Sequence, residues 1–345
     1  METPFVSIVI PCRNEEKFIG KCLDSIVEND YPENKLEVLV VDGNSNDGTK
    51  MLLKKYAEQY PFVKILTNDK RITPVAMNLG IKAARGKYIM ILGSHSEVQK
   101  NFIKENINAF NKYDVDCVGG NIITLWANEN LTAKSIAMGI SHPFGVGNVY
   151  FRIGSKTPRL VDAVPFGCYR REVFEKIGFF DEDLIRNQDD EFNLRLIKNG
   201  GKILLVPEVV SYYYARDSLK KLWKMYYQYG YFKPLVAKKI GAVLTWRQLI
   251  PAAFVSSLIF FGLFSLFFKS FLLIFLPIIL SYLFVNIGFS FMTAVKKGFK
   301  YCFTLPVVFG VLHFSYGLGY LKGIWDFILL KKHKRKALRE ISLSR

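Results

Sequence analysis

VSIVIPCRNEEKFIGKCLDSI (residues 6–26) and LEVLVVDGNSNDGT (36–49) decide the fold of this chain. Each begins with a short apolar run that predicts a buried strand and ends in polar residues. Helical patterns follow over about 16–27 and 49–59. The alternation continues through FVKILT (62–67), a helix near 74–84, and YIMIL (88–92). Alternating strands and helices predict an α/β fold, a Rossmann-like and mostly parallel sheet with helices on both faces.

Polar clusters stand where three of the predicted strands end. They are CRNE at 12–15, DGNSNDG at 42–48 and SHSE at 94–97. Parallel strands end at one edge of their sheet, and open α/β sheets bind ligands at that edge. The three clusters together therefore predict a binding site, although any one of them alone would also suit an ordinary solvated turn.

The formal net charge of +17 belongs to the last third of the chain. Residues 1–217 hold 28 basic and 28 acidic side chains, whereas residues 218–345 hold 19 basic ones against Asp326 and Glu340. These basic residues flank long apolar runs. Nucleic-acid binding would need them on an exposed surface with stacking aromatics. The pattern therefore excludes nucleic acid and favours a membrane with anionic lipids as the partner.

Two apolar runs, about 249–268 and 271–293, each approach the ~20 residues that cross a bilayer as a helix. A third, about 303–321, is weaker because it contains a proline, His313 and several glycines. If the first part of the chain lies inside, two spans return the lysines at 296–300 to the inside. A third full span would carry the basic tail outside, so we expect this run to be re-entrant or interfacial.

The chain carries several further motifs in order, NLGIKAARGKYIMIL (78–92) and VDAVPFGCYRREVFEKIGFFDEDLIRNQDDEFNLRLIKNGGK (161–202). With the two opening stretches, they resemble the family 2 inverting glycosyltransferases, which have the GT-A fold. The resemblance is nearest to the membrane-anchored, ExoA-like branch of succinoglycan glucosyltransferases and covers nearly the whole chain. It implies transfer of a sugar from a nucleotide sugar, commonly a UDP-sugar.

The resemblance also implies a nucleotide-sugar site. Asp42 stands where the family uses an Asp to hydrogen-bond the base; the alternative is a turn-starting Asp that caps its own loop. The other implied binding residues are Pro11, Arg13, Asn14 and Glu15 near the nucleotide, Arg71 and Asn78 toward the diphosphate and sugar, and Gly93 and Ser94. Arg71 has a plain surface arginine as its alternative.

An inverting transfer needs a base that deprotonates the acceptor hydroxyl, and a positioned carboxylate can serve. In the family this base is the Asp of a Glu-Asp pair, six residues before an Arg. Here Gln188 replaces the Glu, and Asp189 stands six residues before Arg195, so Asp189 is the implied base and Asp190 the fallback. Acids also favour helix N-termini for electrostatic reasons, which is the alternative explanation.

The YIMIL strand leads to Gly93-Ser94-His95, where the family has Asp-x-Asp or, in some branches, Asp-x-His. The first acid is missing. Imidazole suits Mn²⁺ and softer ions better than Mg²⁺, which prefers oxygen. We therefore expect His95 to hold a divalent cation, Mn²⁺, with the diphosphate and water or Glu97 at the remaining positions. The alternative is weak metal binding, with basic side chains neutralising the leaving group.

The expected organisation follows from these features. It comprises a cytoplasmic GT-A glycosyltransferase domain at 1–217, a basic aromatic interfacial helix region at 218–247, a membrane domain at 248–330 and a basic tail at 331–345. No signal-peptide pattern is visible, so we expect the catalytic part to stay in the cytoplasm, at the inner or plasma membrane. The five cysteines show no metal-binding spacing and are expected to be reduced thiols.

The membrane segments suggest a polyprenyl-diphosphate-linked or other lipid-borne acceptor for polysaccharide synthesis. Processive synthases carry Gln-x-x-Arg-Trp where this chain has QYGYF (228–232), so a single addition is expected. One alternative function is a non-catalytic, membrane-anchored scaffold that binds nucleotide sugars, which the loss of the first metal-motif Asp would suit. A transporter is disfavoured because two or three spans provide little of a pathway.

Overall fold

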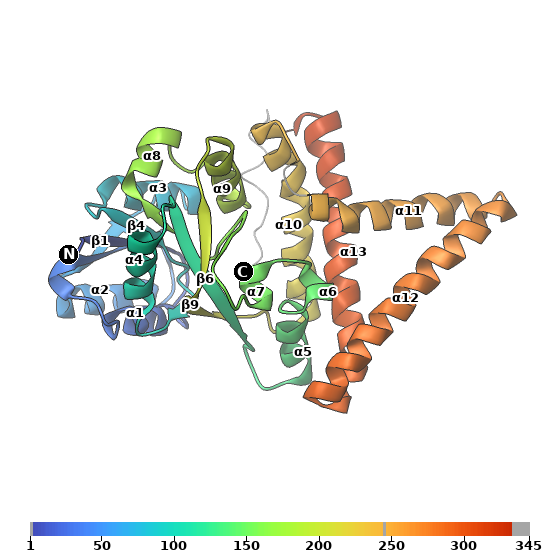
Figure 1. The fold of residues 1–345 in the computed structure, drawn as a ribbon, viewed down its shortest axis with the longest axis horizontal. Helices are drawn as coiled ribbons and strands as arrows, with labels where there is room; N and C mark the ends of the chain where they lie inside the picture. The colour runs from blue at the N-terminus through green and yellow to red at the C-terminus, as the bar shows by residue number, and fades with distance from the viewer. Residues whose placement is uncertain (1–2, 244–245, 333–345) are drawn as a thin grey trace. The chain divides into compact units, whose positions relative to one another are not determined.

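Four parallel strands form the part of the sheet that the apolar runs predict. In the computed structural model, which describes residues 3–243 and 246–332, β1 (Val6–Cys12) lies between β2 (Leu36–Asp42) and β4 (Tyr88–Ile91), and β3 (Val63–Thr67) follows β2. The connecting helices are α1 (Ile19–Val27), α2 (Thr49–Gln59) and α3 (Thr73–Ala83). The predicted alternation of strands and helices is confirmed (Figure 1).

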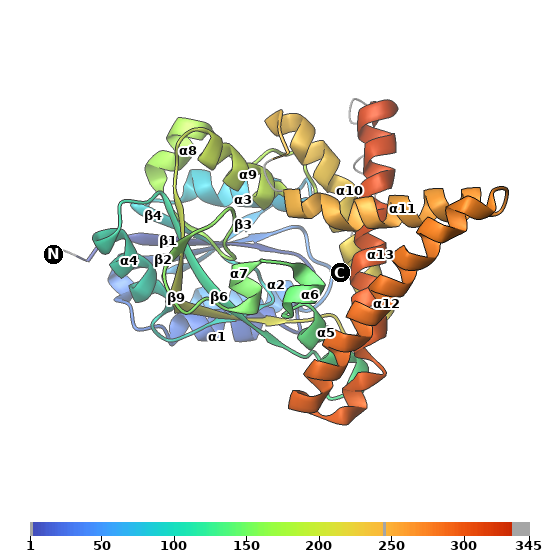
Figure 2. The ribbon, with the colours of Figure 1, turned by 45° about the vertical axis from the view of Figure 1, so that its right-hand side comes forward.

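Antiparallel strands extend the sheet beyond β4. They are β5 (Ser96–Val98), β6 (Cys117–Leu125), β7 (Arg159–Leu160), β8 (Cys168–Arg170) and β9 (Ile203–Tyr214). The strand order is β3-β2-β1-β4-β8-β6-β9-β5, with β7 also on β9. Further helices are α4 (Phe102–Lys112), α7 (Tyr150–Ile153), α8 (Arg171–Ile177) and α9 (Gln188–Lys198). The result is an α/β fold with a mixed sheet (Figure 2).

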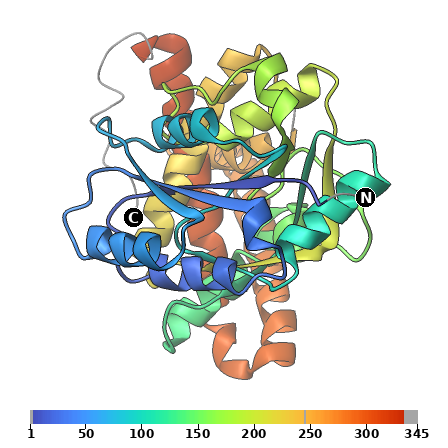
Figure 3. The same cartoon turned by 90° about the vertical axis from the view of Figure 1, so that its left-hand side faces the viewer.

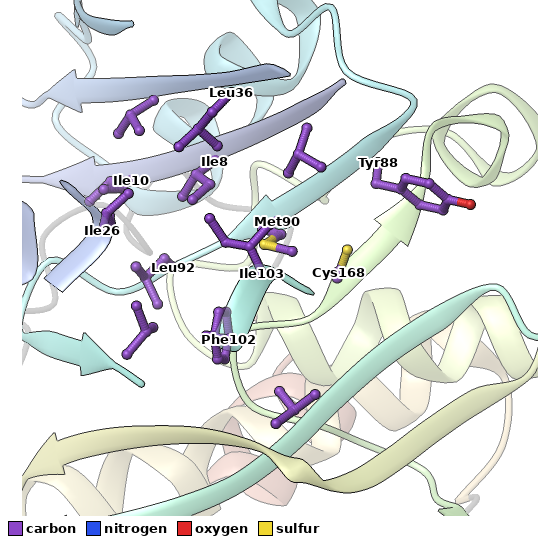
Figure 4. Close-up of a cluster of buried hydrophobic side chains, with 14 of the residues drawn as sticks. Ile8, Ile10, Ile26, Leu36, Tyr88, Met90, Leu92, Phe102, Ile103 and Cys168 are labelled. Atoms are coloured by element: carbon purple, nitrogen blue, oxygen red, sulfur yellow. The ribbon is translucent and has the colours of Figure 1, made fainter. Parts of the chain in front are cut away.

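Side chains of the parallel strands alternate between two buried clusters, one on each face of the sheet. In β1, Ile8 and Ile10 join the first cluster and Val9 the second; in β4, Met90 joins the first and Ile89 the second. The first cluster includes residues of α1, α2 and α4 (Figure 4), and the second includes residues of α3, α8 and α9. Figure 3 shows α1 and α2 on one side of these strands and α3 on the other. A sheet covered on both faces explains why the strands read as continuous apolar runs.

A buried carboxylate ties β1 and β2 to the turn before β4. Glu37, 1% exposed, accepts hydrogen bonds from the Ser7 hydroxyl (2.6 Å) and the Arg85 backbone N–H (2.6 Å). Arg85 Nε (3.2 Å) and Lys64 Nζ (3.5 Å) also contact this carboxylate. Burial alone would raise the pKa of Glu37, but the hydrogen bonds from Ser7 and Arg85 outweigh burial and lower it.

Replacing Glu37 by Gln is expected to destabilise the sheet by about 2–4 kcal/mol at pH 7, because an amide N–H would face the Arg85 donors. The lowered pKa of Glu37 means that its stabilisation is complete above its unfolded pKa of about 4.3 and is lost as pH falls through the folded pKa. The difference between the two proteins should therefore shrink below about pH 4. Hydrogen exchange of peptides covering β1 and β2 measures this, with Glu58→Gln, from an exposed pair with Lys54, as control. If the two proteins differ in stability by the same amount at pH 7 and below about pH 4, the Glu37 carboxylate does not stabilise the sheet through its charge.

The chain divides into two compact units that do not follow its linear order. The first comprises Met1–Ile123 and Tyr150–Tyr214, and the second Thr124–Val149 and Ala215–Arg345. The segment 124–149 lies inside the range expected for the catalytic domain but clusters with the C-terminal helices. The expected basic tail, 331–345, lies outside the described residues from 333 onward.

Helices build the second unit. Those of its first stretch are α5 (Leu131–Gly139) and α6 (Pro143–Val146); those of its second are α10 (Leu219–Ile240), α11 (Ile250–Ser265), α12 (Lys269–Lys297) and α13 (Leu305–Gly323), with a further turn at Ile324–Leu329. Three helical segments are long and apolar enough to cross a membrane: Trp246–Ser265, Lys269–Lys297 and Phe299–Leu329. All three apolar runs of the sequence, including the weaker third one, form helices.

Candidate functional site

The candidate site lies at the carboxyl ends of β1 to β4, within the first unit. The chain runs from β1 outward to β2 and β3 and then returns to β4 on the other side of β1, so the strand order reverses at β1. Such a switch point is where open α/β sheets bind ligands. Cys12 pairs with Asp42 at the ends of β1 and β2, and the Leu92 N–H bonds the Val9 carbonyl at the end of β4. The polar clusters of the sequence therefore do meet at one edge.

Hydrogen bonds join the loops that follow β1 and β2. The Asn14 N–H donates to the Ser45 hydroxyl (2.8 Å), and the Asn14 side-chain oxygen accepts from the Asn46 N–H (3.0 Å). The Glu15 N–H donates to the Thr49 hydroxyl (2.8 Å) at the start of α2. Asn14 and Glu15 are thus held by backbone and side-chain contacts that leave the Glu15 carboxylate for other partners.

Asp42 serves as a cap in its own loop. It is 3% exposed, and its two carboxylate oxygens accept hydrogen bonds from the Ser45 N–H (3.2 Å each) and, for one oxygen, from the Ser45 hydroxyl (2.5 Å). This matches the alternative role considered for Asp42, an Asx turn. A carboxylate has about four acceptor positions, so this role is compatible with a further hydrogen bond to a base.

The loop after β3 is tied to the same edge. The Asn68 N–H bonds the Asp42 carbonyl (2.8 Å), and the Asn44 amide bonds the Asp69 carboxylate (2.9 Å). Arg71 is exposed, and its carbonyl accepts from Arg13 Nη1 (3.5 Å). The structure thus brings Arg13 and Arg71, both expected at the nucleotide, into contact with each other.

Backbone strain gathers in these loops. Among the described non-glycine residues, φ is positive at Asn14, Asn44 and Arg71, one in each of the loops after β1, β2 and β3. It is also positive at Phe166 and Asn187, which precede β8 and α9, and at Lys331 in the second unit. Left-handed backbone at non-glycine residues is costly and tends to gather at functional sites. The strain supports a site here on grounds independent of side-chain type.

His95 meets Glu15 across the switch point. Its Nδ1 lies 3.8 Å from Glu15 Oε1, and the two side chains are 34% and 19% exposed. Glu97, considered in the sequence as a further ligand, instead accepts a hydrogen bond from the Tyr214 hydroxyl (2.8 Å). Burial and this carboxylate raise the pKa of Tyr214 to about 12, so it remains a donor. Glu15, and not Glu97, is therefore the acidic partner of His95.

Gly93 and Ser94 lie between β4 and His95. Ser94 is buried, whereas Gly93 has a half-buried environment in which an added Cβ would stand 3.1 Å from the Phe166 ring. Phe166 adjoins Gly167, whose carbonyl accepts from the Ile91 N–H. The Phe166 ring therefore restricts the space that an Asp side chain at position 93 would need. Pro11, one residue before the end of β1, is half-buried.

Asn78 has a structural role in linking α3 to the segment before α9. Its amide NH₂ donates to the Phe180 carbonyl (2.9 Å) and to Glu182 (3.2 Å), and its oxygen accepts from the Phe180 N–H (3.0 Å). Lys70, in the loop after β3, pairs with the same Glu182 at 3.1 Å. Asn78 and Lys70 therefore connect the loops at the strand ends to the loop that delivers Asp189.

Asp189 is an exposed residue in the first turn of α9, and Asp190 is half-buried beside it. Burial raises the pKa of Tyr169 well above its usual value, and the negative charge of nearby Asp189 adds to this. Tyr169 belongs to β8, which pairs with β4. It also donates to the Asn193 side-chain oxygen (2.8 Å), so α9 is fixed to the strand beside the His95 loop.

Arg195 fixes α9 rather than facing the site. It forms a bidentate ion pair with Glu191 (2.8 and 2.9 Å), donates to the Phe179 carbonyl (2.8 Å) and bonds the Ile177 carbonyl. The six-residue spacing from Asp189 to Arg195 therefore lies within α9. Arg195 holds the first turn of this helix through its ion pair with Glu191.

Glu15 and His95 fit a divalent cation by their chemistry. One imidazole and one carboxylate suit Mn²⁺ and leave positions for diphosphate oxygens. Among the residues that the structure describes, no group of three His, Cys, Asp or Glu side chains could hold a metal ion. The protein would thus contribute two ligands and the nucleotide the rest. All five cysteines are free thiols, as expected.

Comparisons with known proteins agree with the resemblance seen in the sequence. The model of the family described as Glycosyl transferase family 2 matches residues 7–178. A relative from Methanococcus voltae, the dolichyl N-acetyl-alpha-D-glucosaminyl phosphate 3-beta-D-2,3-diacetamido-2,3-dideoxy-beta-D-glucuronosyltransferase, is 36% identical over 263 residues, 74% of this chain and 80% of its own length. The succinoglycan biosynthesis protein ExoA of Rhizobium meliloti is 27% identical over 248 residues, 71% of this chain and 74% of its own length.

A solved structure shares the fold. The mannosyltransferase PcManGT from Pyrobaculum calidifontis, in complex with GDP-Man and Mn²⁺, matches with a TM-score of 0.58 over 94% of this chain and 88% of that one. At 17% identity this likeness speaks to the fold alone. The expected GT-A architecture, an α/β domain with C-terminal apolar helices, is confirmed.

Proposed function

This chain belongs to glycosyl transferase family 2, and we propose that it transfers one sugar, with inversion, from a UDP-sugar to a lipid-borne glycan precursor. That it is a glycosyltransferase follows from its family; the donor, the acceptor and the stereochemistry are the proposal. The observation that carries it is the contact of Glu15 with His95 at the switch point, among loops that hydrogen bonds hold together.

The roles of the loops follow from their chemistry. Asp42 and the Asn14 loop would hold the nucleotide, and Arg13 and Arg71 would place guanidinium groups near phosphate oxygens. Pro11, Gly93 and Ser94 would form the wall between them. Asn78, through its contacts with Phe180 and Glu182, would act as a positioning residue for the loop before α9 rather than as a direct ligand.

Asp189 would act as the base. It would accept the proton of the acceptor hydroxyl as that oxygen attacks the anomeric carbon from the face opposite the diphosphate. The new glycosidic bond forms as the bond to the diphosphate breaks, and the leaving group departs with two negative charges or more. A divalent cation held by Glu15 and His95 would supply positive charge to this leaving group.

Replacing Glu15 or His95, the two residues proposed to hold the cation, is expected to reduce the effect of Mn²⁺ on nucleotide binding. In calorimetry of UDP binding, Mn²⁺ should raise the affinity of the wild-type protein, and Glu15→Gln or His95→Ala should each reduce this gain by about 10–100-fold or more. Glu97→Gln is the matched control and should keep the gain, because Glu97 is engaged by Tyr214. Electron paramagnetic resonance of bound Mn²⁺ gives an independent reading. Loss of the gain in Glu97→Gln, with Glu15→Gln unaffected, would refute the assignment.

The lipid-borne acceptor is supported by the apolar helices and by the M. voltae relative, whose name specifies a dolichyl phosphate-linked substrate. Membranes containing the protein, supplied with radiolabelled UDP-sugars, should label the lipid fraction. Membranes with Asp189→Asn should not. Label confined to water-soluble products would exclude a lipid acceptor. A screen of nucleotide sugars for donor hydrolysis would identify the donor.

The alternative considered from the sequence, a non-catalytic scaffold that binds nucleotide sugars, rested on Gly93, which stands where the family has the first acid of its metal motif. Membership of the family favours the enzyme. A scaffold would bind UDP-sugars without transferring or hydrolysing them, so the same screen of nucleotide sugars distinguishes the two.

A further inference from the structure

Within the second unit, α10 and α13 pack so closely that glycines form the contact. A Cβ at Gly319 of α13 would stand 2.1 Å from the Tyr227 carbonyl oxygen of α10, and one at Gly323 would stand 2.2 Å from that of Tyr231. Gly230 of α10 meets the Tyr316 carbonyl oxygen in the same way, at 2.1 Å. Small residues at such spacing let two helix backbones approach directly. The two helices run side by side (Figures 1 and 2).

Polar contacts continue this seam to the end of α13. Asp326, 3% exposed, accepts hydrogen bonds from the Tyr231 hydroxyl (2.9 Å) and from Lys322 (2.9 Å) and Lys332 (2.8 Å). Lys238 of α10 donates to the Phe327 carbonyl (3.0 Å). The helix that packs against α13 carries lysines toward both of its ends.

α10 does not suit the interior of a bilayer. It carries six lysines in 22 residues: Lys220, Lys221, Lys224, Lys233, Lys238 and Lys239. Charged side chains are rare and costly in the hydrocarbon region. A helix that lies against α10 over much of its length shares its depth, so α13 cannot stand across the membrane while α10 stays out of it.

Besides α11 and α12, which also contact α13, two short helices pack against it. An added Cβ at Gly139 of α5 would stand 2.5 Å from Val308, and the Ser135 hydroxyl lies 2.6 Å from that of Thr304. The Phe144 carbonyl of α6 lies 2.7 Å from His313 Nε2. α5 has nine residues and α6 four, too few to cross a bilayer. Protein covers more of the segment that contains α13 than of the two before it: 39% of the apolar stretch in Phe299–Leu329 is buried, against 11% and 6%.

α11 and α12 have the opposite character. Their apolar side chains are exposed, among them Leu263 of α11 at 57%, and Leu273 and Phe284 of α12 at 76% and 81%. The 20 residues of Trp246–Ser265 span about 30 Å, the thickness of the hydrocarbon core. The two helices leave α13 as a hairpin (Figure 1), with Gly317 of α13 packed on the Pro251 carbonyl at its base.

Charge distinguishes the two ends of this hairpin. Its tip carries one basic residue, Lys269, while its base carries Arg247, Lys296, Lys297 and Lys300. Basic residues beside membrane spans favour the cytoplasmic side. The base therefore belongs on the cytoplasmic side, where the first unit is expected.

We infer that this protein crosses the membrane twice, by the α11–α12 hairpin alone, and that the α10–α13 pair lies along the cytoplasmic bilayer surface. The exposed lysines at the start of α10, Lys220 and Lys224, lie at headgroup depth, and Lys331, after α13, stays on the side of the catalytic unit. This inference does not depend on the proposed reaction, because it concerns only the helices of the second unit.

Cysteine labelling in sealed vesicles of one orientation tests this topology. In a Cys302→Ser background, whose other four cysteines are buried, one cysteine at a time replaces an exposed residue: Lys54 in the first unit, Lys269 at the tip, Lys300 at the base or Lys331 after α13. A membrane-impermeant maleimide should label positions 54, 300 and 331 from one side and position 269 from the other, each with at least a tenfold preference. Transfer activity, measured in parallel, reports on the proposed function separately.

Two results would overturn the inference. Label at 331 from the side that labels 269, or from neither side, would make α13 a span or bury its end in the bilayer. Label at 300 from the side that labels 269 would mean that the hairpin does not return. Lys54 fixes the side of the first unit in each vesicle preparation.

Discussion

Asp189→Asn is expected to lower sugar transfer by about 10²–10⁴-fold while UDP binding stays unchanged. An amide of the same shape cannot take the proton of the acceptor hydroxyl, and Asp189 lies in α9 rather than in the loops proposed to hold the nucleotide. Initial rates with saturating donor, together with calorimetry of UDP binding, measure the two effects. The exposure of Asp189 in the first turn of α9 means that little stability depends on it.

The neighbouring carboxylates provide the controls. Asp190→Asn should change the rate by no more than a few-fold, whereas Glu191→Gln should weaken the Arg195 clamp and lower the stability of α9. A rate that survives in Asp189→Asn but is lost in Asp190→Asn would transfer the base to Asp190. Loss of UDP binding in Asp189→Asn would show that its role is structural.

Gly319→Ala is expected to separate α10 from α13 and to cost about 1–3 kcal/mol or more of stability in the second unit. The new Cβ would stand 2.1 Å from the Tyr227 carbonyl oxygen, and backbone atoms on both sides cannot turn away as a side chain would. Hydrogen exchange of α10 peptides should accelerate, and the hydrogen bond from Tyr231 to Asp326 should be weakened or lost.

Gly310→Ala is the matched control, in the same helix. An added Cβ there meets nothing within 4 Å among the described residues, and alanine is a better helix former than glycine. Gly310→Ala should therefore leave α10 exchange unchanged or slow it. Equal exchange in the two variants would show that the glycine seam does not hold the helices together.

Sequence reasoning was successful where the physical cause is local. The alternation of Ile8, Val9 and Ile10 between two cores needs only a sheet covered on both faces, so β1 to β4 and their helices were predicted from the apolar runs. The loops that meet at the switch point followed from the same topology. That Asp42 caps its own loop was foreseen as an alternative, since Asp before Gly-Asn-Ser is typical of such turns.

Features that depend on distant contacts were not predictable. The pairing of Glu15 with His95 joins residues 80 positions apart, and the diversion of Glu97 to Tyr214 depends on how β5 pairs with β9. The motif places Asn78 in the stretch expected near the diphosphate, but its hydrogen bonds to Phe180 and Glu182, more than 100 residues later, could not be predicted. The glycines of α13 were visible in the sequence, yet their partner helix was not.

The 124–149 segment has a practical consequence for anyone who wants a water-soluble fragment. Cutting the chain after residue 217 would keep α5 and α6 but remove α10 and α13, on which they pack. Apolar residues such as Ile136 and Ile140 would then lose partners and favour aggregation. A fragment fit for crystallisation should also replace 124–149 with a polar linker between residues 123 and 150.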